Sequence, residues 1–111
     1  MKQIDGPGLL AMQGDTPLLL DVREPWEFAL AAIHLDGLRT LHIPMNEIPG
    51  RLAELEGARA DAQPVVCICH HGARSAQVVA FLERQGIEDV YNLAGGVDAW
   101  SAQVDPGVPR Y

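Results

Sequence analysis

The stretch VVCICHHGARS, residues 65–75, changes abruptly from apolar to polar. Its first four residues form a short run rich in branched side chains, which predicts a buried strand. Both cysteines of the chain, Cys67 and Cys69, lie here. A helical pattern follows over residues 75–85, with Gly86 as its expected left-handed stop. The stretch therefore predicts a strand, a polar loop and a helix in succession, with Cys69 at the end of the strand.

Other apolar runs of strand length lie on both sides of this unit. They cover residues 18–20, 41–43 and 90–93, and a weaker strand is expected near residues 2–4. These runs are apolar at consecutive positions and do not alternate with polar residues. Strands of this kind are typical of a parallel sheet that is buried on both faces.

Helical patterns lie between the runs. One begins at Pro25, and Trp26, Leu30 and Ile33 fall on one face of it, so these three side chains are expected to pack inward. Further helices are expected near residues 7–13, 48–55 and 97–103, the last carrying Trp100 in a packed position. Strands that alternate with helices predict an α/β fold, with a mostly parallel central sheet of about five short strands flanked by helices on both faces.

The composition is that of one globular domain. The chain has 111 residues, of which 48% are apolar and 21% are charged,. We expect a single domain over residues 1–111. Residues 104–111, VDPGVPRY, form an extended arm in this prediction, because two prolines and a glycine oppose a helix.

The net charge and the number of cysteines indicate which partners and which cellular compartment are expected. The net charge of −7 repels phosphate backbones and anionic lipid, so neither nucleic acid nor a membrane is an expected partner,. No apolar run approaches the ~20 residues that span a bilayer, and the N-terminus lacks the pattern of a secretory signal. Two cysteines separated by one residue form no disulfide framework. A reducing, cytoplasmic location is therefore expected.

Cys69 is predicted at the carboxyl end of a parallel strand, where α/β folds build their sites. Gly72 permits a tight turn, and the first amides of the following helix lack internal partners. These amides would form a cradle for an anion around the sulfur, and Arg74 adds a fixed positive charge. Ser75 is expected to cap the helix or to donate to a bound group. Such surroundings favour a thiolate, which attacks electrophilic sulfur or phosphorus.

Residues 69–75 resemble the active-site loop of rhodanese-type sulfurtransferases. Three more segments resemble that family in the same order, namely LLLDVREPWEF (18–28), HIPMNEI (42–48) and VYNLAGGVDAW (90–100). The resemblance implies a rhodanese-like fold and a thiosulfate sulfurtransferase. Cys69 would accept a sulfane sulfur from a small anionic donor as a persulfide, and pass it to cyanide, a dithiol or a partner protein. No metal or organic cofactor is implied.

The resemblance also implies roles for the residues of the loop. Arg74 would orient the anionic donor. The rest of the substrate-binding loop would be His70, His71, Gly72, Ala73 and Ser75, acting largely through the backbone. Asp21 and Arg23 either reach the rim of the site or form an internal ion pair. The segment 34–44 departs from the family pattern, so its shape is not predicted.

Two other functions use the same residues. The first is a sulfur-relay or protein-binding module with little turnover of its own, since the tail 104–111 resembles those of domains fused to sulfur-carrier-activating enzymes. The second is a cysteine-dependent phosphatase or arsenate reductase, whose fold is similar. Those enzymes carry a longer loop between cysteine and arginine. Only four residues separate Cys69 from Arg74, which favours a single sulfur atom over a phosphate.

Cys67 also has a simpler interpretation than catalysis. It lies within the expected buried strand and is predicted to be a small core residue. A metal site would need Cys67, Cys69, His70 and His71 to act together. Structural zinc sites space their ligands more widely and need a second pair of ligands elsewhere, so this alternative is disfavoured.

Overall fold

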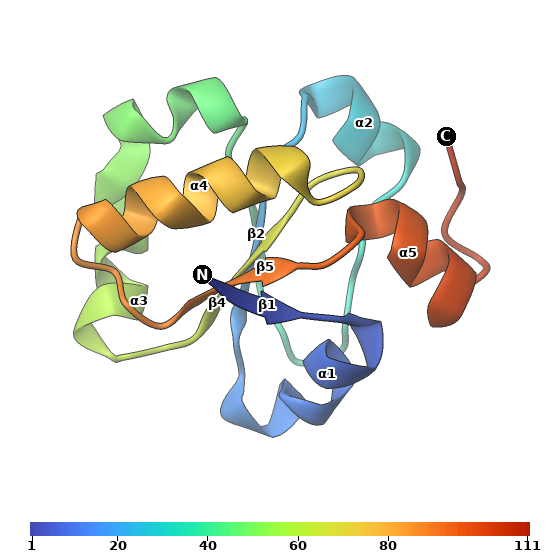
Figure 1. The fold of residues 1–111 in the computed structure, drawn as a ribbon, viewed down its shortest axis with the longest axis horizontal. Helices are drawn as coiled ribbons and strands as arrows, with labels where there is room; N and C mark the ends of the chain where they lie inside the picture. Colours follow the sequence, from blue (N-terminus) through green and yellow to red (C-terminus); the bar gives the residue numbers. More distant parts are fainter.

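A computed structural model describes residues 1–111, and its centre is one parallel sheet of five strands (Figure 1). The strands are β1 (Lys2–Ile4), β2 (Leu18–Asp21), β3 (Thr40–His42), β4 (Val65–Ile68) and β5 (Val90–Leu93). Their order across the sheet is β1-β5-β4-β2-β3, and every pairing is parallel. The predicted α/β class and the five-stranded parallel sheet are confirmed.

Helices cover both faces of the sheet. The α-helices are α1 (Gly6–Ala11), α2 (Pro25–Leu30), α3 (Glu56–Ala60), α4 (Ala73–Arg84) and α5 (Gly96–Gln103), and the 3₁₀ turns are η1 (Gln13–Asp15), η2 (Met45–Glu47) and η3 (Pro49–Leu55). Residues of α3, α4 and η3 pack on one face, and residues of α1 and α5 pack on the other (Figure 1).

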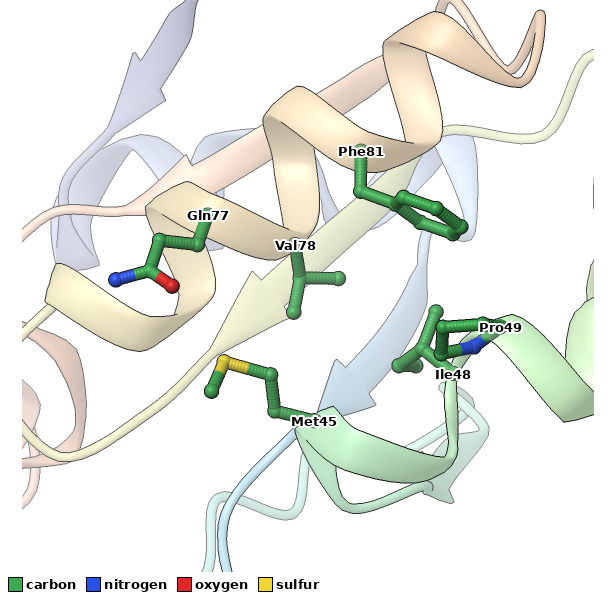
Figure 2. Close-up of a pocket in the computed structure, with 6 residues that line it drawn as sticks. All are labelled: Met45, Ile48, Pro49, Gln77, Val78 and Phe81. Atoms are coloured by element: carbon green, nitrogen blue, oxygen red, sulfur yellow. The ribbon is translucent and has the colours of Figure 1, made fainter.

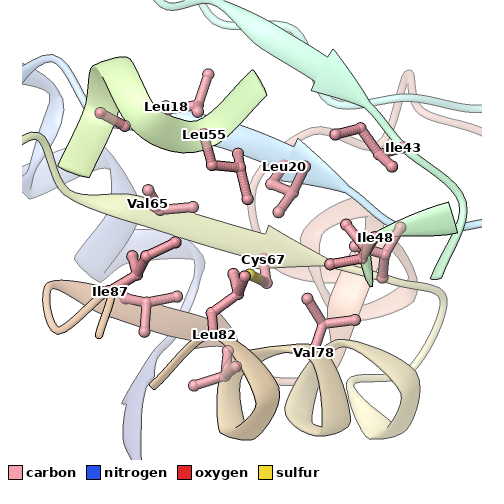
Figure 3. Packing of buried hydrophobic residues seen from close by; sticks show 14 of the residues in the cluster. Leu18, Leu20, Ile43, Ile48, Leu55, Val65, Cys67, Val78, Leu82 and Ile87 are labelled. Carbon is pink, nitrogen blue, oxygen red and sulfur yellow. The ribbon is translucent and has the colours of Figure 1, made fainter. Parts of the chain in front are cut away.

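The central strand β4 shows why its sequence is apolar at every position. Val65 and Cys67 contribute to one core, in which α4 packs against the sheet (Figure 3). Val66 and Ile68 contribute to the second core, on the opposite face. All four side chains are buried, because successive residues of a strand point to opposite faces and both faces are covered,. Cys67 is a core residue, as predicted.

The helix α2 begins at Pro25 as predicted, but the prediction of its inward face was wrong. Trp26 is 63% exposed and Leu30 is 49% exposed, although both were expected to pack inward. Ile33 is buried, but it lies beyond the helix, because the chain becomes extended at Ala31. The residue that α2 buries is Glu27. An ion pair described below holds Glu27 inward and turns the apolar residues of the helix outward. Trp100 of α5 is buried, as expected.

The region around residues 48–55 forms 3₁₀ turns in place of the expected α-helix. Pro49 lacks an N–H group, and Arg51 leaves helical geometry at φ −125°, so the ladder of helical hydrogen bonds is interrupted,. Ile48 and Leu55 are nevertheless buried. At the end of α4, Gly86 has a φ of +86° and is the left-handed stop that was predicted.

Residues 104–111 form no helix and fold back along α5 (Figure 1). Val108 is buried in the second core, and its carbonyl accepts a hydrogen bond from the Ser101 hydroxyl. Arg110 pairs with Asp98 at 3.0 Å. The arm thereby brings Tyr111 to the site described next. No helix in the structure has both the length and the apolar character that crossing a membrane requires.

Candidate active site

Cys69 directly follows β4, and a loop joins it to the start of α4 at Ala73. Gly72 makes the turn possible, because its φ of +102° lies in the left-handed region that favours glycine,. A Cβ atom at this position would also lie 3.2 Å from the amide nitrogen of Gly95. The predicted sequence of strand, loop and helix therefore places Cys69 at the N-terminal end of α4.

The start of α5 holds this loop in place. Val97 N–H donates to the carbonyl of Cys69 at 2.9 Å, and Asp98 N–H donates to the carbonyl of His70 at 3.1 Å. The backbones are so close at Gly96 that a Cβ atom there would overlap both carbonyl oxygens. α5 therefore occupies two of the carbonyl acceptors of the loop and fixes its backbone.

Two donors reach the sulfur of Cys69. Gly72 N–H lies 3.0 Å from Sγ, and the Ser75 hydroxyl lies 3.2 Å from it. The amides of Ala73 and Arg74, which open α4, donate to no acceptor within the protein,. Of the two roles expected for Ser75, capping of the helix is not observed, because Gly72 is the N-cap. The Ser75 side chain is instead buried between Cys69 and Asn92.

Arg74 carries the fixed positive charge that the sequence predicted, and in the structure it is paired with Glu27. Its guanidinium donates to both carboxylate oxygens of Glu27, at 2.7 and 2.8 Å. These bonds lower the pKa of the Glu27 carboxyl to about 2 and raise the pKa of Arg74. A guanidinium has five N–H donors, so Arg74 retains donors that Glu27 does not use.

Asp21 and Arg23 form an internal ion pair, which is one of the two arrangements that the sequence left open. Their closest contact is 2.7 Å, and both side chains are almost fully buried. Arg23 also donates to the carbonyls of Glu27 and Ala31 at the end of α2, and the Glu27 carbonyl accepts a second bond from the N–H of Ala31. The pair therefore fixes α2, and with it the carboxylate of Glu27 that holds Arg74.

The two loop histidines differ in their surroundings. The ring of His70 stacks on Tyr111, with centroids 3.8 Å apart, and its Nε2 atom is buried with no hydrogen-bond partner. Burial, together with the neighbouring His71, lowers the pKa of the His70 imidazole. His71 is exposed, and its Nδ1 atom lies 4.0 Å from Asp98. His70 is thus neutral near neutral pH.

Tyr111 joins the end of the chain to the site. Its hydroxyl accepts a hydrogen bond from Arg23 at 2.8 Å and donates one to Glu27 at 3.1 Å. Its ring forms a T-shaped pair with Trp26, at a centroid distance of 5.9 Å. One aromatic residue of the arm therefore contacts the loop through His70 and the ion-pair network through its hydroxyl.

The sulfur of Cys69 has little contact with solvent, because the residue is only 1% exposed. A separate apolar pocket of about 200 Å³ lies between η2, η3 and α4 (Figure 2). Its lining is Met45, Ile48, Pro49, Gln77, Val78 and Phe81. It contains no ionisable side chain and no residue of the loop, so it offers no chemistry of its own.

Sequence reasoning missed three residues of the site, Glu27, Asn92 and Tyr111. Glu27 had a signal, because Glu24 and Glu27 flank Pro25 in the spacing of a capping box, which the structure contains,. Asn92 was a polar residue within an apolar run. Tyr111 gave no local signal, since only the folding of the arm brings it near. No group of three or more His, Cys, Asp or Glu side chains is arranged to hold a metal ion.

Comparison with known proteins identifies relatives across most of the chain. Residues 8–103 match the family described as the rhodanese-like domain. A protein named sulfurtransferase from Allochromatium vinosum is 39% identical over 103 residues, covering 91% of this chain and 89% of the relative. The thiosulfate sulfurtransferase GlpE of Pseudomonas fluorescens is 34% identical over 99 residues, covering 89% and 84%.

Longer proteins and solved structures match as well. The rhodanese-like/PpiC domain-containing protein 12, chloroplastic, of Arabidopsis thaliana is 34% identical over 97 residues, but the chain spans only 31% of its length. The crystal structure of a rhodanese-related protein from Thermoplasma volcanium has a TM-score of 0.81 at 29% identity, and the match covers 100% of both chains.

Proposed function

The chain belongs to the rhodanese-like family, and from this premise we propose that it is a sulfurtransferase in which Cys69 carries the sulfur as a persulfide. The observation that supports this best is the pair of donors on the Cys69 sulfur, from Gly72 at 3.0 Å and Ser75 at 3.2 Å. Donors at this distance stabilise negative charge on the Cys69 sulfur. The amides of Ala73 and Arg74, which have no acceptor within the protein, are available to an attached second sulfur,.

The first step uses a small anionic donor, with thiosulfate as the candidate. A lone pair of the Cys69 thiolate attacks the outer sulfur of thiosulfate and forms a new S–S bond. The original S–S bond breaks, and sulfite leaves with its electron pair. Residues 70–75 would surround the donor, and the guanidinium donors of Arg74 that Glu27 does not use would orient it,.

The second step returns the enzyme to its starting state. A nucleophilic acceptor, such as cyanide or a thiolate, attacks the outer sulfur of the persulfide. The bond between the two sulfurs breaks, and its electron pair returns to Cys69 as a thiolate. Each step transfers one sulfur atom with no net oxidation, so no external oxidant or cofactor takes part. A cytoplasmic location would keep both cysteines reduced for this chemistry.

The decisive experiment is mass spectrometry of the native protein after incubation with thiosulfate. We expect a gain equal to one sulfur atom on Cys69, which is lost again on addition of cyanide or a dithiol. Cys69→Ser should abolish both the adduct and turnover. Cys67→Ser is the matched control and should retain most activity, because burial raises the pKa of the Cys67 thiol and keeps it protonated. An adduct on Cys67, or none at all, would contradict the proposal.

A relay module with little turnover of its own is a second candidate, which the near-complete burial of Cys69 favours. In that case the persulfide forms in a single turnover, while the steady-state rate with cyanide stays low and rises only with a protein acceptor. The phosphatase alternative predicts Cys69-dependent release of phosphate from an aryl phosphate. The loop of four residues between Cys69 and Arg74 leads us to expect none.

A further inference from the structure

Asn92 is a buried polar residue in the otherwise apolar strand β5, and it lies beside Ser75. Its side-chain NH₂ group donates to the carbonyl of Gly72 at 3.1 Å and to Gln3 at 3.0 Å. A backbone carbonyl only accepts hydrogen bonds, so the NH₂ group must face Gly72. The orientation of the amide is thereby fixed, and Oδ1 of Asn92 faces the Ser75 hydroxyl as an acceptor.

The Ser75 hydroxyl has two neighbours that compete for its proton. One is Oδ1 of Asn92, and the other is the Cys69 sulfur at 3.2 Å. A hydroxyl has one proton to donate. When Cys69 is a thiol, its S–H can donate to Ser75, and the Ser75 proton is free to go to Asn92. When Cys69 is a thiolate, the sulfur can only accept, and both neighbours require the same proton.

We propose that Asn92 is a positioning residue that competes with the Cys69 sulfur for the single hydroxyl proton of Ser75 and so restrains ionisation of the thiol. If the Ser75 hydroxyl donates its proton to the Cys69 thiolate, the buried Oδ1 atom of Asn92 is left without a hydrogen-bond donor, which is unfavourable. If Ser75 stays with Asn92, the thiolate loses one of its two donors.

The competition has a consequence for the persulfide, and this part rests on the proposed function. In a persulfide the negative charge lies on the outer sulfur, and the Cys69 sulfur is no longer an anion. The Ser75 proton can then return to Asn92. The arrangement therefore favours the loaded protein over the free thiolate, and it keeps the thiol basic enough to remain a strong nucleophile.

The test is the pH profile of alkylation of Cys69 by a small haloacetamide, in the wild type, N92A, S75A and the double variant. N92A should move the midpoint down by about one pH unit, which is about tenfold more thiolate below both midpoints. S75A should move the midpoint up. The double variant should match S75A, because Asn92 acts only through Ser75.

Matched variants separate this effect from a loss of structure. Gln3→Ala removes the other partner of the Asn92 amide and leaves the contact with Ser75, so the midpoint should not change. Asn92→Leu preserves the volume of the side chain better than alanine and should shift the midpoint like N92A. After either change at position 92 the Gly72 carbonyl still accepts a bond from Ala76 at 3.2 Å. The charged and titratable groups of the site stay the same in all variants. Cys67 and Arg74 interact electrostatically with Cys69, and Glu27, His70, His71, Asp98 and Tyr111 surround the loop and Arg74.

An unchanged or raised midpoint in both N92A and N92L would overturn the proposal. So would a downward shift of the same size in the S75A background, since Asn92 would then act without Ser75. Alkylation measures ionisation alone and does not depend on sulfur transfer. If the protein formed no persulfide, the proposed function would be contradicted, but the alkylation profiles would still test the role of Asn92.

Discussion

Arg74 and Glu27 form a two-bond ion pair that joins the helix after the loop to the helix after β2, with N–O distances of 2.7 and 2.8 Å. The two residues are 47 positions apart in the sequence. Glu27 is buried, while the Arg74 side chain is 33% exposed. The pair fixes Arg74 beside the Cys69 loop and simultaneously sets which face of α2 points inward.

Removal of the Glu27 carboxylate should lower the free energy of unfolding and should also make that free energy less dependent on pH in the acidic range. Arg74 lowers the pKa of Glu27 from 4.5 to about 2, so the folded protein binds this proton less readily than the unfolded chain. The resulting stabilisation is fully present above pH 4.5 and is lost as the pH falls toward 2,. We expect Glu27→Gln to cost about 1–2 kcal/mol at neutral pH, given the partial exposure of Arg74.

Urea unfolding at a series of acidic pH values would measure this difference. The gap between wild type and Glu27→Gln should narrow as the pH falls below 4.5. Glu47→Gln, at an exposed position outside the site, is the control and should follow the wild type. A gap that is constant with pH would show that the ionised carboxylate is not the source of the stabilisation.

The close approach of Gly96 to the loop predicts that even a methyl group will disrupt the site. Gly96→Ala combines a φ of +59° with an overlap on the carbonyls of Cys69 and His70. The strain should lower the free energy of unfolding by about 1–3 kcal/mol and displace the loop. The rate of sulfur transfer should fall more than tenfold, which corresponds to an increase of more than about 1.4 kcal/mol in the activation free energy. Gly57→Ala is the matched control, because nothing lies within 4 Å of its Cβ position and it stands in α3. Thermal unfolding and turnover together report the outcome, and equal behaviour of the two variants would be inconsistent with the clash.

Tyr111 should limit access to Cys69 through its ring rather than through its hydroxyl. The ring stacks on His70, next to a cysteine that is 1% exposed. Tyr111→Ala should therefore speed alkylation of Cys69 by a bulky maleimide more than by a small haloacetamide. Tyr111→Phe retains the ring and should keep the wild-type ratio of the two rates, while losing about 1 kcal/mol of stability from the hydroxyl bonds. A rise in the ratio for both variants would assign the effect to the hydroxyl network.

The two tryptophans should differ sharply in their importance for stability. Trp100 is buried in the second core, and Trp100→Ala should cost about 3–5 kcal/mol,. Trp26 is 63% exposed and forms a T-shaped pair with Tyr111, so Trp26→Ala should change stability by less than about 1 kcal/mol,. Denaturant unfolding of the two single variants decides this, and similar losses would disprove the exposure of Trp26.

The sequence predicted those features that local patterns determine. The apolar run in β4 indicated a strand buried on both faces, and Gly86 indicated the end of α4; both were confirmed. The direction of α2 could not be read locally. Glu27 points inward because it pairs with Arg74, which lies far along the chain. This ion pair determines the orientation of the helix against the expectation from the apolar residues Trp26 and Leu30.

The sequence predicted the loop of the site but not the residues that support it. The loop from Cys69 to Arg74 is continuous in sequence, so its order of strand, turn and helix was readable. The residues that support it come from elsewhere, including Asn92 beside Ser75 and Tyr111 beside His70. The order of the strands across the sheet and the fold of the arm bring these residues together, and the sequence analysis predicted neither.

The hold of α5 on the loop has a consequence for synthesis of the protein. Val97 and Asp98 donate to the loop carbonyls, and both follow Cys69 by more than twenty residues in the chain. A ribosome therefore releases the cysteine before the segment that shapes its surroundings. Until residues 92–111 emerge, the loop lacks the donors of α5 and Ser75 lacks Asn92, so a chain that terminates within that segment would carry Cys69 without a completed site.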